Sequence, residues 1–149
     1  MAKFTYKLQN ILDIKYKLEN QAKSEFSMAN ATLLREEEKL KALTTRKKLY
    51  EMQGKNLVKD KIDIVAIKEN KNAVSAMMYA IEQQKIQIKR AQDMVEQARR
   101  KLNDVMMERK THEKLKEKEF EEFKQEINYE ENKSIDESVS YTFGKKTKS

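Results

Sequence analysis

The chain has 149 residues, of which 38% are charged, and its formal net charge at pH 7 is +7. It contains no proline, no tryptophan, no cysteine and only two glycines. So polar a chain of this length cannot enclose a large apolar interior, and nothing in it suggests a globular core with a catalytic cleft. Disorder throughout is the other option for this composition, but a sustained period of aliphatic residues favours ordered helices.

Residues 4–53 are expected to form the first helix. Apolar side chains recur there mostly three or four positions apart, which is the spacing of one face of a coiled-coil helix. These positions are Phe4, Leu8, Ile11, Leu18, Ala22, Phe26, Ala29, Leu33, Leu40, Leu43 and Tyr50. Two successive steps of four, from Leu18 to Ala22 and from Ala22 to Phe26, predict a stutter that locally unwinds the supercoil.

A turn is expected at residues 54–62. The periodic pattern stops at Gln53, and Gly54 suits the left-handed backbone conformation that ends many helices. Asp63 is then predicted to be the N-cap of a second helix, which is expected to run from 63 to about 132.

The second helix carries the most regular pattern in the chain. One position in every seven is aliphatic, and the companion positions are apolar apart from Asn70 and Gln84. This seam comprises Ile67, Val74, Ile81, Ile88, Val95 and Leu102, with Met77, Ala91, Ala98 and Val105 as companions. A repeat of about 3.5 residues needs a partner helix with which to supercoil.

The two seams lie in one chain and can satisfy each other. We therefore predict an all-α fold, a long antiparallel two-helix coiled-coil hairpin over residues 1–132, and a monomer in solution. Residues 133–149 have no period and are expected to form a disordered, flexible C-terminal tail.

A turn centred near residue 58 sets the expected register of the hairpin. It places Phe4 opposite Glu113, and Gln84 opposite Leu33. At this register the alanines of the two seams come near each other at Ala22, Ala29, Ala91 and Ala98. They either let the helices approach closely or fill undemanding positions as good helix formers.

After Val105 the second seam becomes polar. It continues through Arg109, His112, Lys116 and Glu119. Because a helix without a partner needs no apolar seam, everything beyond His112 is expected to overhang.

The chain offers no constellation for catalysis. His112 is its single histidine, and with no cysteine present a set of nucleophile, base and orienting acid cannot be assembled. The acidic runs at 36–38 and 121–122 are typical of solvated helix faces rather than metal sites, and no glycine-rich phosphate-binding motif is present. We expect no enzyme, no metal site and no cofactor.

The positive charge raises nucleic acid as a partner, but the pattern does not favour it. The densest basic patches, at 46–48 and 99–101, lie among 25 acidic residues and match no reader motif. No run approaches the roughly 20 apolar residues that span a bilayer, and the first residues lack the apolar stretch of a signal peptide. We expect a cytoplasmic protein whose membrane role comes through a partner, because its apolar stripe is committed to the seam.

The opening segment Phe4 to Lys15, followed by Glu19, Lys23 and the run Glu36 to Leu40, resembles the start of the FliJ family of the bacterial flagellar export apparatus. Members of that family form a long antiparallel two-helix coiled coil. The resemblance implies a central stalk of the flagellar type III export ATPase, and so a role in flagellum biogenesis, motility and chemotaxis.

The resemblance also implies a surface that binds the ATPase hexamer. The end that carries both termini would enter the pore of the ring and promote its assembly and activity. The ring-contacting residues would be Phe4, Leu8, Gln9, Leu12 and Asp13, with the facing overhang near 112–123. Leu12 and Asp13 are expected on the outward flank of the seam.

A second implied partner is the large membrane protein of the export gate. The matching stripe is Ala73, Met77, Ala80 and Gln84, at spacings that put the four on one side of the helix, close to the flank of the seam. This chain departs from better-known members of the family in carrying Ala73 in place of an aromatic residue and Gln84 in place of a histidine.

The family further implies escort of export chaperones and a place at the inner face of the cell membrane, at the flagellar base. The alternative from another class is a free-standing coiled-coil scaffold or a basic nucleic-acid adaptor without a ring partner.

Overall fold

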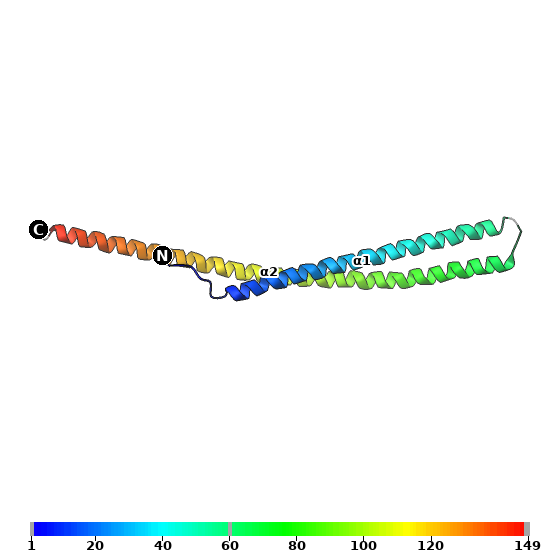
Figure 1. The fold of residues 1–149 in the computed structure, drawn as a ribbon, viewed down its shortest axis with the longest axis horizontal. Coiled ribbons are helices and arrows are strands. Elements are labelled where there is room, and N and C mark those ends of the chain that lie inside the picture. Colours follow the sequence, from blue (N-terminus) through cyan, green and yellow to red (C-terminus); the bar gives the residue numbers. More distant parts are fainter. Residues whose placement is uncertain (1, 60, 148–149) are drawn as a thin grey trace. The chain divides into compact units, whose positions relative to one another are not determined.

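The computed structural model describes residues 2–59 and 61–147, and these form two α-helices, α1 (Gln9–Leu57) and α2 (Ile64–Thr147), with no strand among them (Figure 1). The chain divides into two compact units, to which both helices contribute. Unit 1 is Met1–Glu19 with Asp104–Ser149, and unit 2 is Asn20–Asn103. The predicted all-α antiparallel two-helix hairpin is confirmed.

The seam of α2 lies where its period predicts. All of its predicted positions from Ile67 to Val105 are buried or half-buried, including the polar Asn70 and Gln84. The α1 positions from Ala22 to Tyr50 are buried or half-buried as well. The aliphatic repeat thus marks the helix faces that pack together.

At the start of α1 the predicted seam is wrong. Leu18 is 40% exposed, whereas Leu12 is 2% exposed and Glu19 is 4% exposed. The inward positions Leu12, Glu19 and Ala22 continue the steps of the remaining seam, so α1 has no stutter. The expectation failed because the seam position is occupied by a charged residue, Glu19. The apolar pattern instead assigned its neighbour Leu18 to the seam.

The turn begins later than predicted. α1 continues through Gly54 to Leu57, and neither glycine has a positive φ, so Gly54 does not end the helix. The predicted N-cap is confirmed, because the Asp63 Oδ1 accepts hydrogen bonds from the backbone N–H groups of Val65 (3.1 Å) and Ala66 (3.3 Å).

The register of unit 2 also differs from the predicted one, because α1 ends later than expected. Gln84 bonds Glu36 rather than lying opposite Leu33: its Nε2 donates to the Glu36 carbonyl oxygen (2.9 Å) and to its carboxylate (2.5 Å). Because α1 runs past Gly54, the turn lies further along the chain than the expected centre, and this shifts every pair.

The register of unit 1 differs from the predicted one already within α1, where Gln9 bonds Lys116 and Glu19 bonds Arg109. The displacement continues into residues 2–6, which have no regular structure. The ring of Phe4 lies against Phe120 (centroids 5.0 Å apart) and Phe123 (5.3 Å) instead of Glu113. The unpartnered part of α2 begins well beyond the expected His112.

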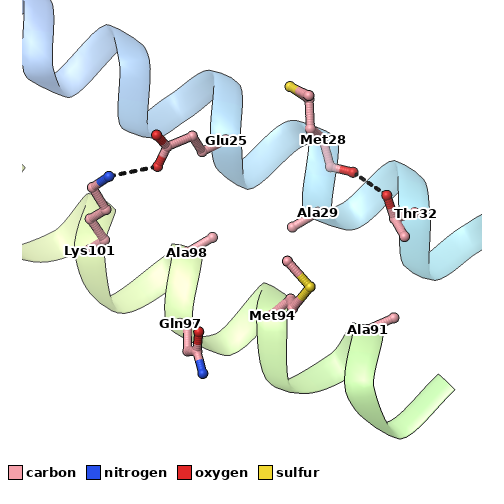
Figure 2. Close-up of a pocket in the computed structure, with 9 residues that line it drawn as sticks. All are labelled: Glu25, Met28, Ala29, Thr32, Ala91, Met94, Gln97, Ala98 and Lys101. Atoms are coloured by element: carbon pink, nitrogen blue, oxygen red, sulfur yellow. Dashed lines mark hydrogen bonds and ion pairs between the residues drawn. The ribbon is translucent and has the colours of Figure 1, made fainter. Parts of the chain in front are cut away.

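The alanines of the two seams face each other as expected. Ala22 and Ala91 are 1% and 3% exposed. Ala29, Ala91 and Ala98 line a shallow groove of about 430 Å³ between the helices, beside the Glu25–Lys101 ion pair (2.9 Å) (Figure 2). Methyl side chains at these positions leave the groove unfilled.

α2 extends beyond the boundary predicted near 132. Residues 133–147 are helical, and from Asn128 to Thr142 every side chain is exposed. No proline occurs there and the first glycine is Gly144, so nothing local stops the helix. A helix without packing is marginal in water. Flexibility of the segment therefore stays a prediction, and its last residues, 148–149, lie outside the described residues.

In the part of the chain that the structure describes, neither helix has an apolar stretch that would cross a bilayer.

Candidate functional site

The most elaborate side-chain arrangement lies in unit 1, where the seam is polar. Arg109 of α2 forms a two-point ion pair with Glu19 of α1, its Nε and Nη2 lying 2.6 and 3.1 Å from the two carboxylate oxygens. Arg109 Nη1 donates to Glu113 (2.9 Å). These hydrogen bonds, to Glu19 first and then Glu113, raise the pKa of the guanidinium. Paired charges thus replace apolar packing at this level.

Tyr16 closes the arrangement on the α1 side. Its hydroxyl donates to the Glu113 carboxylate, and the guanidinium carbon of Arg109 lies 5.8 Å from its ring centroid. The hydrogen bond to Glu113 raises the pKa of Tyr16. The pKa of Glu113 is lowered, mainly by that bond from Tyr16 and then by the one from Arg109, although desolvation opposes the shift. Glu113 is therefore held in its ionised form.

Gln9 links the first turn of α1 to α2. Its Oε1 accepts from the Lys116 ammonium (2.6 Å), and its Nε2 donates to the carboxylate of Asp13 (2.9 Å). Asp13 is exposed. The amide therefore holds an exposed carboxylate in a set orientation.

The segment before α1 is anchored by aromatic packing. Phe4 is half-buried against Phe120 and Phe123, and Tyr6 is 5% exposed. The Tyr6 carbonyl accepts from the Gln9 backbone N–H (3.1 Å) and so starts the first turn. These contacts fix the irregular segment along α2.

The structure brings together the five residues expected to bind a ring, but it does not expose them all. Leu8 is 39% exposed and Asp13 is exposed, while Phe4 and Gln9 are half-buried. Leu12 is buried, so the expectation that it lies on the outward flank is wrong. Leu12 is buried because the seam of unit 1 passes through Leu12 and Glu19.

Other apolar side chains of α1 lie exposed in unit 1, although Ile11 and Leu18 were expected in the seam. Ile11, Ile14 and Leu18 are 39%, 53% and 40% exposed. Their spacings of three and four put them on one flank of the helix, beside the seam. Together with Leu8 they form what we term the apolar flank. The continued steps through Leu12 and Glu19 were the signal that could have identified it.

The stripe expected to bind an export gate faces α1. Ala73, Met77, Ala80 and Gln84 are all half-buried. The side-chain amide of Gln84 donates a hydrogen bond to the Glu36 carboxylate, and this bond is the main cause that lowers the pKa of Glu36. The stripe therefore lies close to the seam, as expected, and offers only its edges as a surface.

Within the described ranges, 2–59 and 61–147, no group of three or more acidic or histidine side chains is placed to hold a metal ion.

These features define a two-helix coiled-coil protein with an aliphatic seam in one unit and an ion-paired seam beside an exposed apolar flank in the other. The sequence model described as "Flagellar FliJ protein" matches residues 4–148, and the chain belongs to this family, whose members take part in flagellar protein export. Comparisons with curated proteins and with solved structures give no significant match.

Proposed function

We propose that this protein is the non-enzymatic central stalk of the flagellar type III export ATPase complex, where it promotes assembly and activity of the hexameric ring. Family membership supports a role in flagellar export. The observation that carries the proposal further is the apolar flank of unit 1, which lies beside the ion-paired seam.

The composition of this surface suits docking into a ring. Leu8, Ile11, Ile14 and Leu18 supply exposed apolar anchors, and Asp13, oriented by Gln9, supplies a charge beside them. Interfaces commonly combine apolar anchors with a polar rim. The network around Arg109 keeps the helix surface in one conformation, which lowers the entropic cost of binding.

The finer roles of the family belong to the same proposal. The stalk would couple the ring to the membrane protein of the export gate through the edges of Ala73, Met77, Ala80 and Gln84, and it would escort export chaperones. It would work in the cytoplasm, associated peripherally with the inner face of the membrane.

ATP hydrolysis by the cognate ATPase, measured with and without this protein, tests the proposal. Ile11→Ser with Ile14→Ser should remove most of the stimulation while circular dichroism shows unchanged helicity. Met107→Ser is the matched control, since Met107 is a 67% exposed apolar residue of the same unit on α2.

Two results would count against the proposal. Stimulation by the Ile11→Ser/Ile14→Ser variant equal to that of the unmodified protein would exclude the apolar flank as the docking surface. Absence of stimulation by the unmodified protein would favour the free-standing scaffold.

A further inference from the structure

The turn of the hairpin exposes a second apolar surface, unrelated to the apolar flank of unit 1. Val58, Ile62, Ile64 and Val65 are 59%, 71%, 75% and 66% exposed. They lie in the turn that joins α1 to α2 (Figure 1) and in the first two residues of α2, which precede Ile67, the first seam position of that helix. We term residues 55–59 and 61–68 the hairpin tip. Its aliphatic side chains therefore remain outside the intramolecular packing.

Lysine side chains accompany these aliphatic residues. Lys55, Lys59, Lys61 and Lys68 are all exposed. The nearest described carboxylate in the turn, Asp63, is occupied with capping the N-terminus of α2. Cationic and aliphatic groups are thus interleaved at one end of unit 2.

The sequence of the tip has a positive balance of charge. Residues 55–68 carry four Lys against two Asp, a net charge of +2. A partner that recognises the tip should be anionic and should accept short aliphatic side chains.

We propose that the hairpin tip docks on an anionic lipid surface. Interfacial segments insert apolar side chains to the boundary of headgroups and acyl chains, while their lysines remain among anionic headgroups. The tip is a turn at which side chains point outward from two helix ends, so a deformable lipid surface needs no complementary groove. Backbone groups of the turn stay at the hydrated headgroup level, where they keep their hydrogen bonds to water.

This inference does not rest on the proposed ring binding, since it concerns other residues in the other unit. The apolar stripe was expected to be committed to the seam, whereas the aliphatic side chains of the tip are exposed outside it. It also supplies a direct membrane contact, where the sequence suggested contact only through a partner.

Co-sedimentation of the full chain with lipid vesicles tests the proposal. Binding is expected to vesicles of phosphatidylcholine containing phosphatidylglycerol, to be weak with phosphatidylcholine alone, and to fall as salt screens the charges. Ile62→Ser with Ile64→Ser should weaken binding about tenfold or more, because two exposed aliphatic side chains no longer insert. Leu34→Ser with Met94→Ser is the matched control, as these residues of unit 2 are 61% and 62% exposed and lie away from the tip.

Lys59→Gln with Lys61→Gln separates the electrostatic contribution. It should reduce binding to anionic vesicles and flatten the salt dependence, whereas Lys85→Gln with Lys89→Gln, at exposed positions further along α2, should change it less. The chain has no tryptophan, so Ile62→Trp gives a single probe whose emission should shift to the blue on vesicle binding.

Several outcomes would overturn the proposal. These are no binding to anionic vesicles at low salt, equal binding to neutral vesicles, and a tip variant that binds as tightly as the Leu34→Ser/Met94→Ser control. Self-association of the free protein that is lost in the tip variant would assign the tip to a contact between copies of the chain instead.

Discussion

The side chain of Asn70 fills the space that a Cβ on Gly54 would need. A Cβ at Gly54 would lie 2.4 Å from the Asn70 Oδ1, and the Nδ2 of the same amide donates to the Tyr50 carbonyl (2.8 Å). The glycine thus serves a contact between the helices rather than the end of one. Asn70 is one of two polar residues of α2 in the seam of unit 2, with Gln84, and the missing side chain of Gly54 leaves a notch that admits it.

Gly54→Ala should therefore depend on Asn70. In a helix interior alanine is favoured over glycine by about 1 kcal/mol. In the native background this gain should be offset by displacement of the Asn70 amide, whose hydrogen bond contributes about 0.5–1.5 kcal/mol. In an Asn70→Ala background the gain should appear in full. Urea unfolding of the native protein, the two single variants and the double variant measures the coupling between the two positions. Identical effects of Gly54→Ala in both backgrounds would show that Asn70 does not depend on the space at Gly54.

Truncation should cost much more stability at Leu12 than at Leu8. Leu12→Ala should lower the free energy of unfolding by about 2–4 kcal/mol, because it empties a fully buried site. Leu8→Ala, at a 39% exposed position, should cost less than about 1 kcal/mol. Denaturant unfolding of the two variants provides the comparison. Equal losses would show that the seam of unit 1 does not pass through Leu12.

Removing one partner of the Glu19–Arg109 ion pair should lower the stability of the fold more than replacing both partners. Glu19→Leu leaves the guanidinium without its two-point partner, whereas Glu19→Leu with Arg109→Leu restores an apolar layer. The double variant should melt at a higher temperature than the single variant. If the single variant is as stable as the double, the pair does not determine the packing of unit 1.

Stability should decline as the pH falls below about 4.5. The folded structure lowers the pKa of Glu113 through Tyr16 and Arg109, of Glu36 through Gln84 and of Glu108 through Lys15, from an ordinary value of 4.5. Between the lowered values and 4.5 the unfolded chain binds more protons than the folded chain. The stabilisation is therefore complete above pH 4.5 and is lost as pH falls through the folded pKa values.

Thermal unfolding followed by circular dichroism across this range tests the pH dependence. Glu113→Gln should lower the melting temperature at neutral pH, and its difference from the native protein should shrink as the pH drops. Glu117→Gln, at an exposed position, is the matched control. A constant difference from neutral pH to well below 4.5 would show that Glu113 does not titrate as described.

The sequence predicts the hairpin well because aliphatic residues carry most of its seam. From Ile67 to Val105 the inward positions are nearly all apolar, so the period alone locates them. Asp63 was likewise predictable, since a carboxylate before a periodic segment is a local capping signal.

The remaining features depend on partners distant in the chain, which a periodic pattern does not reveal. Glu19 occupies the seam only because Arg109 meets it, and a lone charged residue is ordinarily assigned to the surface. Gly54 resembles a helix end until Asn70 is placed against it. These two positions moved the seam of unit 1 and the register of unit 2, and with them the exposure of the candidate docking residues.

The notch at Gly54 also has a mechanical consequence. It is the sole glycine of α1, so Asn70 finds space at one level alone, and Gln84 is bonded to Glu36 at a second level. Sliding one helix past the other would drive side chains against the amide of Asn70 and break both polar layers. An axial load applied to one helix of unit 2 is therefore passed to the other as shear, and the pair bears it as one strut.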